Sequence, residues 1–172
     1  LRRQRQMCIR DSATPETLGE DRLAAAVGAA SLYPGRNLLI VDFGTAITID
    51  QVSADGVFRG GNISPGVQMR FRALHDYTAA LPLCEASEDR ILLGRSTVEA
   101  IRQGVMNGIT FEIEGYIARF RRENADICII FTGGAAKNFA KRIKNTIFAN
   151  CNLVFCGLDR ILEYNASEEH LD

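Results

Sequence analysis

Residues 38–66 read Leu-Leu-Ile-Val-Asp-Phe-Gly-Thr-Ala-Ile-Thr-Ile-Asp-Gln-Val-Ser-Ala-Asp-Gly-Val-Phe-Arg-Gly-Gly-Asn-Ile-Ser-Pro-Gly. The first four residues are continuously apolar, which is typical of a strand buried on both faces of a sheet, and they end at the carboxylate of Asp42. A turn at 43–45 separates this strand from a second, alternating strand at 46–52. We therefore expect a hairpin that places Asp42 at the end of a buried strand.

The chain continues from this hairpin into a third strand. Residues 54–56 carry an Asp-Gly turn, and residues 57–60 are expected to form the strand that follows it. Residues 60–66 are too rich in Gly and Pro for a simple strand, so we expect a loop that brings backbone close to a ligand or to a neighbouring segment. A helix is expected at 67–74.

The turn after Asp42 has the residue types of a phosphate-binding site. Gly44 has no Cβ, so the backbone can approach a ligand closely, and N–H groups there can bind phosphate oxygens together with the Thr45 hydroxyl. Asp42 can hold the cation that accompanies a phosphate. The alternative is a hairpin whose aspartate caps a turn, and the Asp-x-Gly-Thr pattern alone does not separate the two.

The composition indicates a cytoplasmic globular protein. Of 172 residues, 47% are hydrophobic, and the net charge of −1 gives no electrostatic case for binding nucleic acid or an anionic membrane. No apolar run approaches the roughly 20 residues of a membrane span, no secretory signal is visible, and the two histidines lack the spacing of zinc ligands. Five cysteines are expected to be reduced core thiols: Cys8, Cys84, Cys128, Cys151 and Cys156.

The first twelve residues differ from the rest of the chain. They are basic and aperiodic and lack an initiating Met, so we expect non-native sequence such as translated adapter read-through; a basic tail that binds nucleic acid is the alternative. Residues 13–36 contain an Ala-rich helix, expected over Asp21–Leu32 and ended by Tyr33-Pro34-Gly35. From the residues alone, the favoured role of Asp21 is to cap this helix.

A long helix is expected to open at Ser96 or Thr97, either of which is a natural N-cap. Apolar residues recur at helical spacing from Ile101 to Phe120. Gly104 and Gly108 are expected to permit close packing of this helix against another.

A strand–turn–helix unit follows. Residues 127–131 predict another buried strand, followed by Thr132-Gly133-Gly134 and a helix from 135 to about 147. A double glycine there is a recurrent way to place an adenine nucleotide over a helix N-terminus, although any tight turn can use glycine. A last strand at 153–155 and a helix at 157–162 are expected to follow. Three antiparallel strands, helix, strand and helix make an α/β unit that is one half of a duplicated architecture.

Five motifs in this order resemble those of type III pantothenate kinases, a family of the acetate and sugar kinase, heat-shock chaperone and actin superfamily. They are Leu18-Gly19-Glu20-Asp21-Arg22, Asp42-Phe43-Gly44-Thr45-Ala46, Gly60-Gly61-Asn62-Ile63-Ser64-Pro65-Gly66, Thr97-Val98-Glu99-Ala100-Ile101 and Thr132-Gly133-Gly134. The resemblance runs from about Thr14 to Ile161, and five ordered motifs are far more specific than any one of them.

The resemblance implies two ribonuclease-H-like (actin-like ATPase) domains, each with a mixed sheet and flanking helices, around a cleft. Residues 37–172 would form the second domain, residues 13–36 the end of the first, and residues 1–12 lie outside the fold. The family's N-terminal phosphate loop has no counterpart here, and its pantothenate-contacting Tyr would fall near Ser12. We therefore expect an N-terminally truncated chain that is inactive alone.

The resemblance also implies ATP-dependent phosphorylation of pantothenate to 4'-phosphopantothenate, the first step of coenzyme A biosynthesis. Asp21 matches the catalytic base, so the resemblance favours this role over helix capping. Thr45 matches the ATP-phosphate contact, Asp42 matches the ligand of a monovalent cation (K⁺ or NH₄⁺), and a divalent cation, Mg²⁺, is expected with ATP. A homodimer is implied, with pantothenate near the subunit interface. The family's substrate-binding positions match Gly19, Glu20, Asp21, Arg22 and Thr97.

Two other functions are open at this point. One is a non-catalytic regulatory protein on the same fold, since some relatives are named as accessory factors for transcription. The other is a different small-molecule phosphotransferase or phosphatase of the superfamily. The net charge argues against direct DNA binding. Loss of chemistry is disfavoured by the presence of Asp21, Arg22, Asp42, Thr45 and Thr97.

Overall fold

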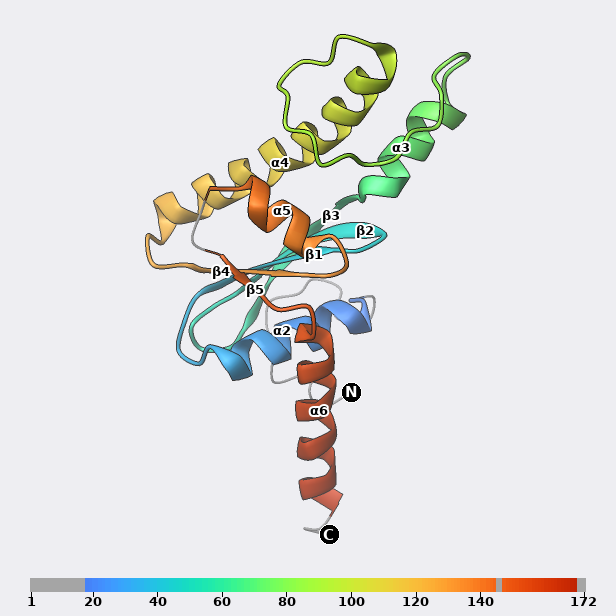
Figure 1. Cartoon of the computed structure of the whole chain (residues 1–172). Coiled ribbons are helices and arrows are strands. Elements are labelled where there is room, and N and C mark those ends of the chain that lie inside the picture. Colours follow the sequence, from blue (N-terminus) through green and yellow to red (C-terminus); the bar gives the residue numbers. More distant parts are fainter. Residues whose placement is uncertain (1–17, 145–146, 170–172) are drawn as a thin grey trace.

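The computed structural model describes residues 18–144 and 147–169, and a five-stranded mixed sheet lies at its centre (Figure 1). The strands run in the order β3-β2-β1-β4-β5. Strand β2 is antiparallel to both of its neighbours, β1 and β3, whereas β4 and β5 run parallel to β1. The expected α/β fold with a mixed sheet is confirmed. The strand bounds are β1 (Leu38–Phe43), β2 (Ala46–Val52), β3 (Phe58–Pro65), β4 (Cys128–Thr132) and β5 (Phe148–Ala149).

Helices cover both faces of the sheet (Figure 1). One face carries α2 (Glu20–Leu32) and α6 (Leu153–Glu169), and the other carries α3 (Val67–Asp76), α4 (Thr97–Glu123) and α5 (Ala136–Arg142). None of the helices in the described part of the chain is both long enough and apolar enough to cross a membrane.

Burial on both faces explains the continuous apolar run of β1. Leu39 and Val41 pack in the core beneath α3, α4 and α5, whereas Leu38 and Ile40 pack in the core beneath α2 and α6. Side chains alternate between the faces of a strand, so a strand covered on both sides requires apolar residues at every position. By the same alternation, Asp42 lies on the face that α2 covers.

Helices α2 and α6 cross at two glycines. A Cβ at Gly157 would collide with the carbonyl oxygen of Ala24 and lie 3.0 Å from the backbone nitrogen of Gly28. A Cβ at Gly28 would in turn collide with the carbonyl oxygen of Leu153. The two helices therefore meet backbone to backbone, and this contact holds α2 against the sheet.

The third strand is longer than the sequence predicts, and the loop expected at 60–66 is wrong. β3 continues to Pro65 and pairs with β2 as far as Ala46. Its glycines are tolerated because β3 is an edge strand and because a side chain at Gly61 would collide with Asp50 of β2.

The segment 153–155, expected as a strand, forms the first turn of α6, and the last strand is β5. Leu153, Gly157 and Ile161 are buried at a spacing of four residues, which is the period of a helix packed on one side. The preceding helix, α5, ends at Arg142 and is shorter than expected.

The glycines of α4 and two of the cysteines also differ from expectation. A Cβ at Gly104 would meet nothing within 4 Å, and at Gly108 the atom within that range is Arg70 Nη1 at 3.9 Å, so neither glycine marks a close helix contact. Cys151 is exposed and Cys156 half-buried, and neither is a core thiol.

The other cysteines are accounted for separately. Cys84 and Cys128 are free and buried, as expected, and Cys8 lies outside the described residues.

Candidate active site

Three turns meet at the edge of the sheet where β1 and β4 end. Asp42 lies opposite Thr132 in the parallel pairing of β1 with β4. Gly133 follows with a φ of 86°, and a side chain there would collide with the Asp42 carboxylate. At the end of β3, the backbone N–H of Gly66 donates to the carbonyl oxygen of Thr45 at 3.1 Å. This packing fixes the β1–β2 turn beside the double glycine.

The two turns beside Asp42 are accessible to a ligand. Gly44, Thr45 and Gly134 are exposed, and a Cβ at Gly134 would meet nothing within 4 Å. A Cβ at Gly44 would lie 3.5 Å from Asp42 Oδ1, so glycine keeps that side of the carboxylate accessible. A half-buried carboxylate beside accessible backbone is a donor set that fits a monovalent cation and the phosphate oxygens near it.

The N-terminus of α2 carries Asp21 and Arg22 on the same side of the sheet as Asp42. The N-cap of this helix is Gly19, and the helix has no side-chain cap. Asp21 is exposed in the first turn and accepts a hydrogen bond from the Arg22 backbone N–H at 2.9 Å. Gly19 rather than Asp21 is thus the N-cap residue, but the Asp21 carboxylate does bond a backbone N–H of the first turn, and it is also accessible to a ligand.

The pKa of Asp42 is affected by burial and by carboxylates on α2 and β2. Burial raises the pKa of the Asp42 carboxyl above its ordinary value, and the negative charges of Asp21 and Asp50 raise it further. The structure thus brings Asp21, Arg22 and Asp42 together.

Asp50 is a residue of this region that the sequence reasoning missed. It is 1% exposed, and it accepts hydrogen bonds from Arg22 Nε at 3.1 Å to each carboxylate oxygen and from Nη2 to Oδ1. Burial raises the pKa of the Asp50 carboxyl, while the hydrogen bonds and charge of Arg22 lower it. The alternating sequence of β2 predicts that Thr48 and Asp50 lie on one face of the strand. It does not predict that helices cover this face, so it gives no indication that Asp50 is buried.

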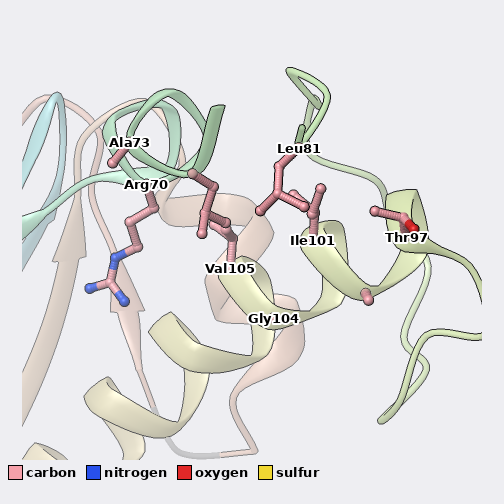
Figure 2. Close-up of a pocket in the computed structure, with 9 residues that line it drawn as sticks. Arg70, Ala73, Leu81, Thr97, Ile101, Gly104 and Val105 are labelled. Carbon is pink, nitrogen blue, oxygen red and sulfur yellow. The ribbon is translucent and has the colours of Figure 1, made fainter. Parts of the chain in front are cut away.

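Thr97 lies apart from this group, on the opposite face of the sheet. Ser96 is the N-cap of α4 and accepts from the Glu99 N–H, so Thr97 is not needed as a cap. It lines a cavity of about 640 Å³ between α3 and α4, where Figure 2 shows apolar side chains between Arg70 and Thr97. The lining residues are Arg70, Ala73, Leu74, Leu81, Thr97, Ala100, Ile101, Gly104 and Val105.

No group of three or more His, Cys, Asp or Glu side chains within residues 18–144 and 147–169 is arranged to hold a metal ion. A divalent cation in phosphoryl transfer is commonly held by one or two carboxylates together with the substrate phosphates, so it does not require such a group.

Comparison with known proteins gives one consistent family. The family model for type III pantothenate kinase matches residues 3–119. Similar curated proteins include the type III pantothenate kinase of Cytophaga hutchinsonii, 50% identical over 155 residues that cover 90% of this chain and 66% of the relative. The type III pantothenate kinase of Flavobacterium psychrophilum is 47% identical over 152 residues, which cover 88% of this chain and 63% of the relative.

One similar solved structure, from Campylobacter jejuni, is described as a conserved Baf family transcriptional activator. It has a TM-score of 0.66 and 26% sequence identity, and the match covers 95% of this chain and 72% of that one. The chain spans between 63% and 66% of the length of the first curated relatives it matches.

Proposed function

The chain belongs to the type III pantothenate kinase family, and we propose that it takes part in the ATP-dependent phosphorylation of pantothenate to 4'-phosphopantothenate, the first step of coenzyme A biosynthesis. The observation that carries this proposal is the exposed Asp21 carboxylate, held on the same side of the sheet as Asp42 and the accessible turn at Gly44 and Thr45. A base and a phosphate site on neighbouring elements are what transfer to a hydroxyl requires.

Asp21 is the proposed base. Its carboxylate takes the proton of the primary hydroxyl of pantothenate while the hydroxyl oxygen bonds to the γ-phosphorus of ATP. The bond from that phosphorus to the β–γ bridging oxygen breaks, and ADP leaves. Arg22 carries a permanent positive charge that suits the anionic substrate or the transferring phosphoryl group.

Asp42 and Thr45 are the proposed nucleotide side of the site. The Thr45 hydroxyl and the accessible backbone at Gly44 would bind phosphate oxygens, and Asp42 would hold K⁺ or NH₄⁺ beside them. Such a cation supplies positive charge next to the transferred phosphate, and Mg²⁺ would enter with the nucleotide.

Thr97 is the proposed substrate contact from a second copy of the chain. Within one chain it lies across the sheet from Asp21, and it lines a cavity with largely apolar walls that suits a small molecule with a branched carbon chain. In a homodimer whose α3–α4 cavity faces the α2 side of the other copy, Thr97 of one copy would lie near Asp21 of the other.

We also propose the domain division given by the family resemblance, with residues 37–172 as the second ribonuclease-H-like domain and 13–36 as the end of the first. The strand order β3-β2-β1-β4-β5 and the helices on both faces of the sheet support the assignment of residues 37–172 to one such domain. We also propose that the reaction takes place in the cytoplasm, where ATP is available.

A product assay tests the function. With the N-terminal phosphate loop of the family present, the gene product should form 4'-phosphopantothenate from ATP and pantothenate and should leave a panel of other small hydroxyl acceptors largely unmodified. The likeness to a structure described as a transcriptional activator keeps a regulatory role as the alternative. A well-folded dimer that phosphorylates none of the acceptors would support that alternative, and preference for another acceptor would indicate a different phosphotransferase.

A further inference from the structure

The Arg22 guanidinium is held from one side by a buried carboxylate. The Arg22 Nε and Nη2 groups donate to Asp50, whose side chain is 2% exposed, while the Arg22 side chain is 14% exposed. None of these hydrogen bonds uses Arg22 Nη1, so the ion pair leaves this nitrogen for another acceptor. A two-point contact of this kind fixes the plane of the guanidinium as well as its position.

Residues of β2 and β3 pack closely around the ion pair of Arg22 and Asp50. Gly61 lies directly opposite Asp50 in the pairing of β2 with β3, and a side chain at Gly61 would collide with Asp50 Oδ1 and approach Arg22 Nη2. The guanidinium carbon lies 5.6 Å from the centre of the Phe58 ring. Gly61 of the Gly-Gly motif therefore has a structural reason, which is to leave room for the pair.

The pair also determines where the proposed base lies. Arg22 follows Asp21 directly in the first turn of α2, which has no side-chain cap to fix it. The first intrahelical hydrogen bond of this turn runs from Leu23 N to Gly19 O at 3.1 Å. An anchor on Arg22 therefore fixes the turn that carries Asp21.

We propose that Asp50 is a positioning residue that clamps Arg22, and through it the first turn of α2, so that Asp21 and Arg22 Nη1 meet the anionic substrate in one orientation. This inference rests on the proposed function. It assigns to the reaction a residue that touches no substrate.

The test compares Asp50→Asn with Asp55→Asn in the gene product. Both variants change a carboxylate of the same hairpin to an amide, but Asp55 is exposed and pairs with Arg59 at 3.8 Å away from α2. Asp50→Asn should lower kcat/KM for pantothenate about ten- to a hundredfold, since small misplacements of reacting groups have effects of this size, and should leave KM for ATP within about twofold. Asp55→Asn should change neither constant.

Two further variants separate positioning from loss of fold. With Arg22→Lys in the background, Asp50→Asn should cause little additional loss, because lysine cannot form the two-point contact that Asp50 supports. If Asp50→Asn does not fold, Phe58→Leu keeps both charges and loosens the clamp, and it should lower kcat/KM at least about threefold.

Hydrogen exchange gives a readout independent of activity. The Leu23 amide should exchange at least about tenfold faster in Asp50→Asn than in Asp55→Asn. An active wild type with unchanged kcat/KM and unchanged exchange in Asp50→Asn would overturn the positioning role alone. A folded wild type that includes the N-terminal phosphate loop of the family and still makes no 4'-phosphopantothenate would overturn the proposed function and, with it, the assignment of Asp50 to this reaction.

Discussion

The substitution Gly157→Ala tests the crossing of α2 and α6, on which the placement of Asp21 depends. The added methyl group would collide with the carbonyl oxygen of Ala24 and lie 2.6 Å from its carbonyl carbon. Both are backbone atoms of a helix, so no flexible side chain can move aside, and the two helices must separate. Overpacking of this kind costs about 1–3 kcal/mol.

Helix propensity acts in the opposite direction. Alanine is favoured over glycine inside a helix by about 1 kcal/mol, so the matched control is Gly115→Ala in α4, where a Cβ would meet nothing within 4 Å. We expect Gly115→Ala to raise Tm by about 2–4 °C in a chain of this size. Because backbone atoms cannot move aside, we expect the overpacking cost of Gly157→Ala at the upper end of its range, about 3 kcal/mol. After the gain in helix propensity, the net destabilisation is about 2 kcal/mol, which corresponds to a Tm lower by about 4–8 °C.

The assay is thermal unfolding followed by circular dichroism, with urea unfolding at 25 °C to obtain the free energy of unfolding. The two alanine substitutions have the same chemistry and the same helix propensity, so their opposite signs report the contact between the helices. If Gly157→Ala raised Tm as Gly115→Ala does, α6 would not pack against α2 as described and the reasoning would be refuted.

Three further predictions concern the site. Asp21→Asn should reduce turnover at least about a hundredfold, because an amide cannot act as the base; near-normal kcat would contradict this. Tm should be nearly unchanged, since the amide oxygen can still accept the hydrogen bond from the Arg22 N–H. Burial raises the pKa of the Asp42 carboxyl in the folded protein. The contribution of this group to the stability of the fold is therefore fully present below the unfolded pKa of about 3.9, and it is lost as pH rises through the folded pKa. Asp42→Asn should therefore raise Tm at pH 7 without added potassium and change it little near pH 3, and a lower Tm at pH 7 would count against the burial argument. Thr97→Ala should raise KM for pantothenate severalfold and leave Tm within about 1 °C, since Ser96 caps α4; an unchanged KM would remove Thr97 from the site.

The sequence predicts the fold well in segments whose apolar residues follow a single clear pattern. The continuous apolar runs predict β1 and β4, and helical spacing predicts α4, because each of these elements buries a face that its own residues specify. The Ala-rich stretch and the Tyr-Pro-Gly that ends it predict α2. The Asp-x-Gly-Thr turn and the double glycine are likewise predicted, since the chemistry of a tight approach requires glycine there.

The errors occur where tertiary contacts override local signals. Gly60 and Pro65 are typical of a loop, yet β3 continues because β2 offers a pairing partner and Asp50 requires a neighbour without a side chain. Residues 153–155 are apolar enough for a strand, but the contact of Gly157 with α2 requires a helix. The ion pair of Asp50 with Arg22 joins residues 28 positions apart, and no local pattern encodes it.

The most direct test of the proposed function is formation of 4'-phosphopantothenate from ATP and pantothenate by the gene product, measured with and without potassium and with or without the N-terminal phosphate loop of the family. We predict product only when that loop is present, with a rate that rises on addition of potassium. A folded dimer that includes the loop and still forms no 4'-phosphopantothenate would contradict the proposed function.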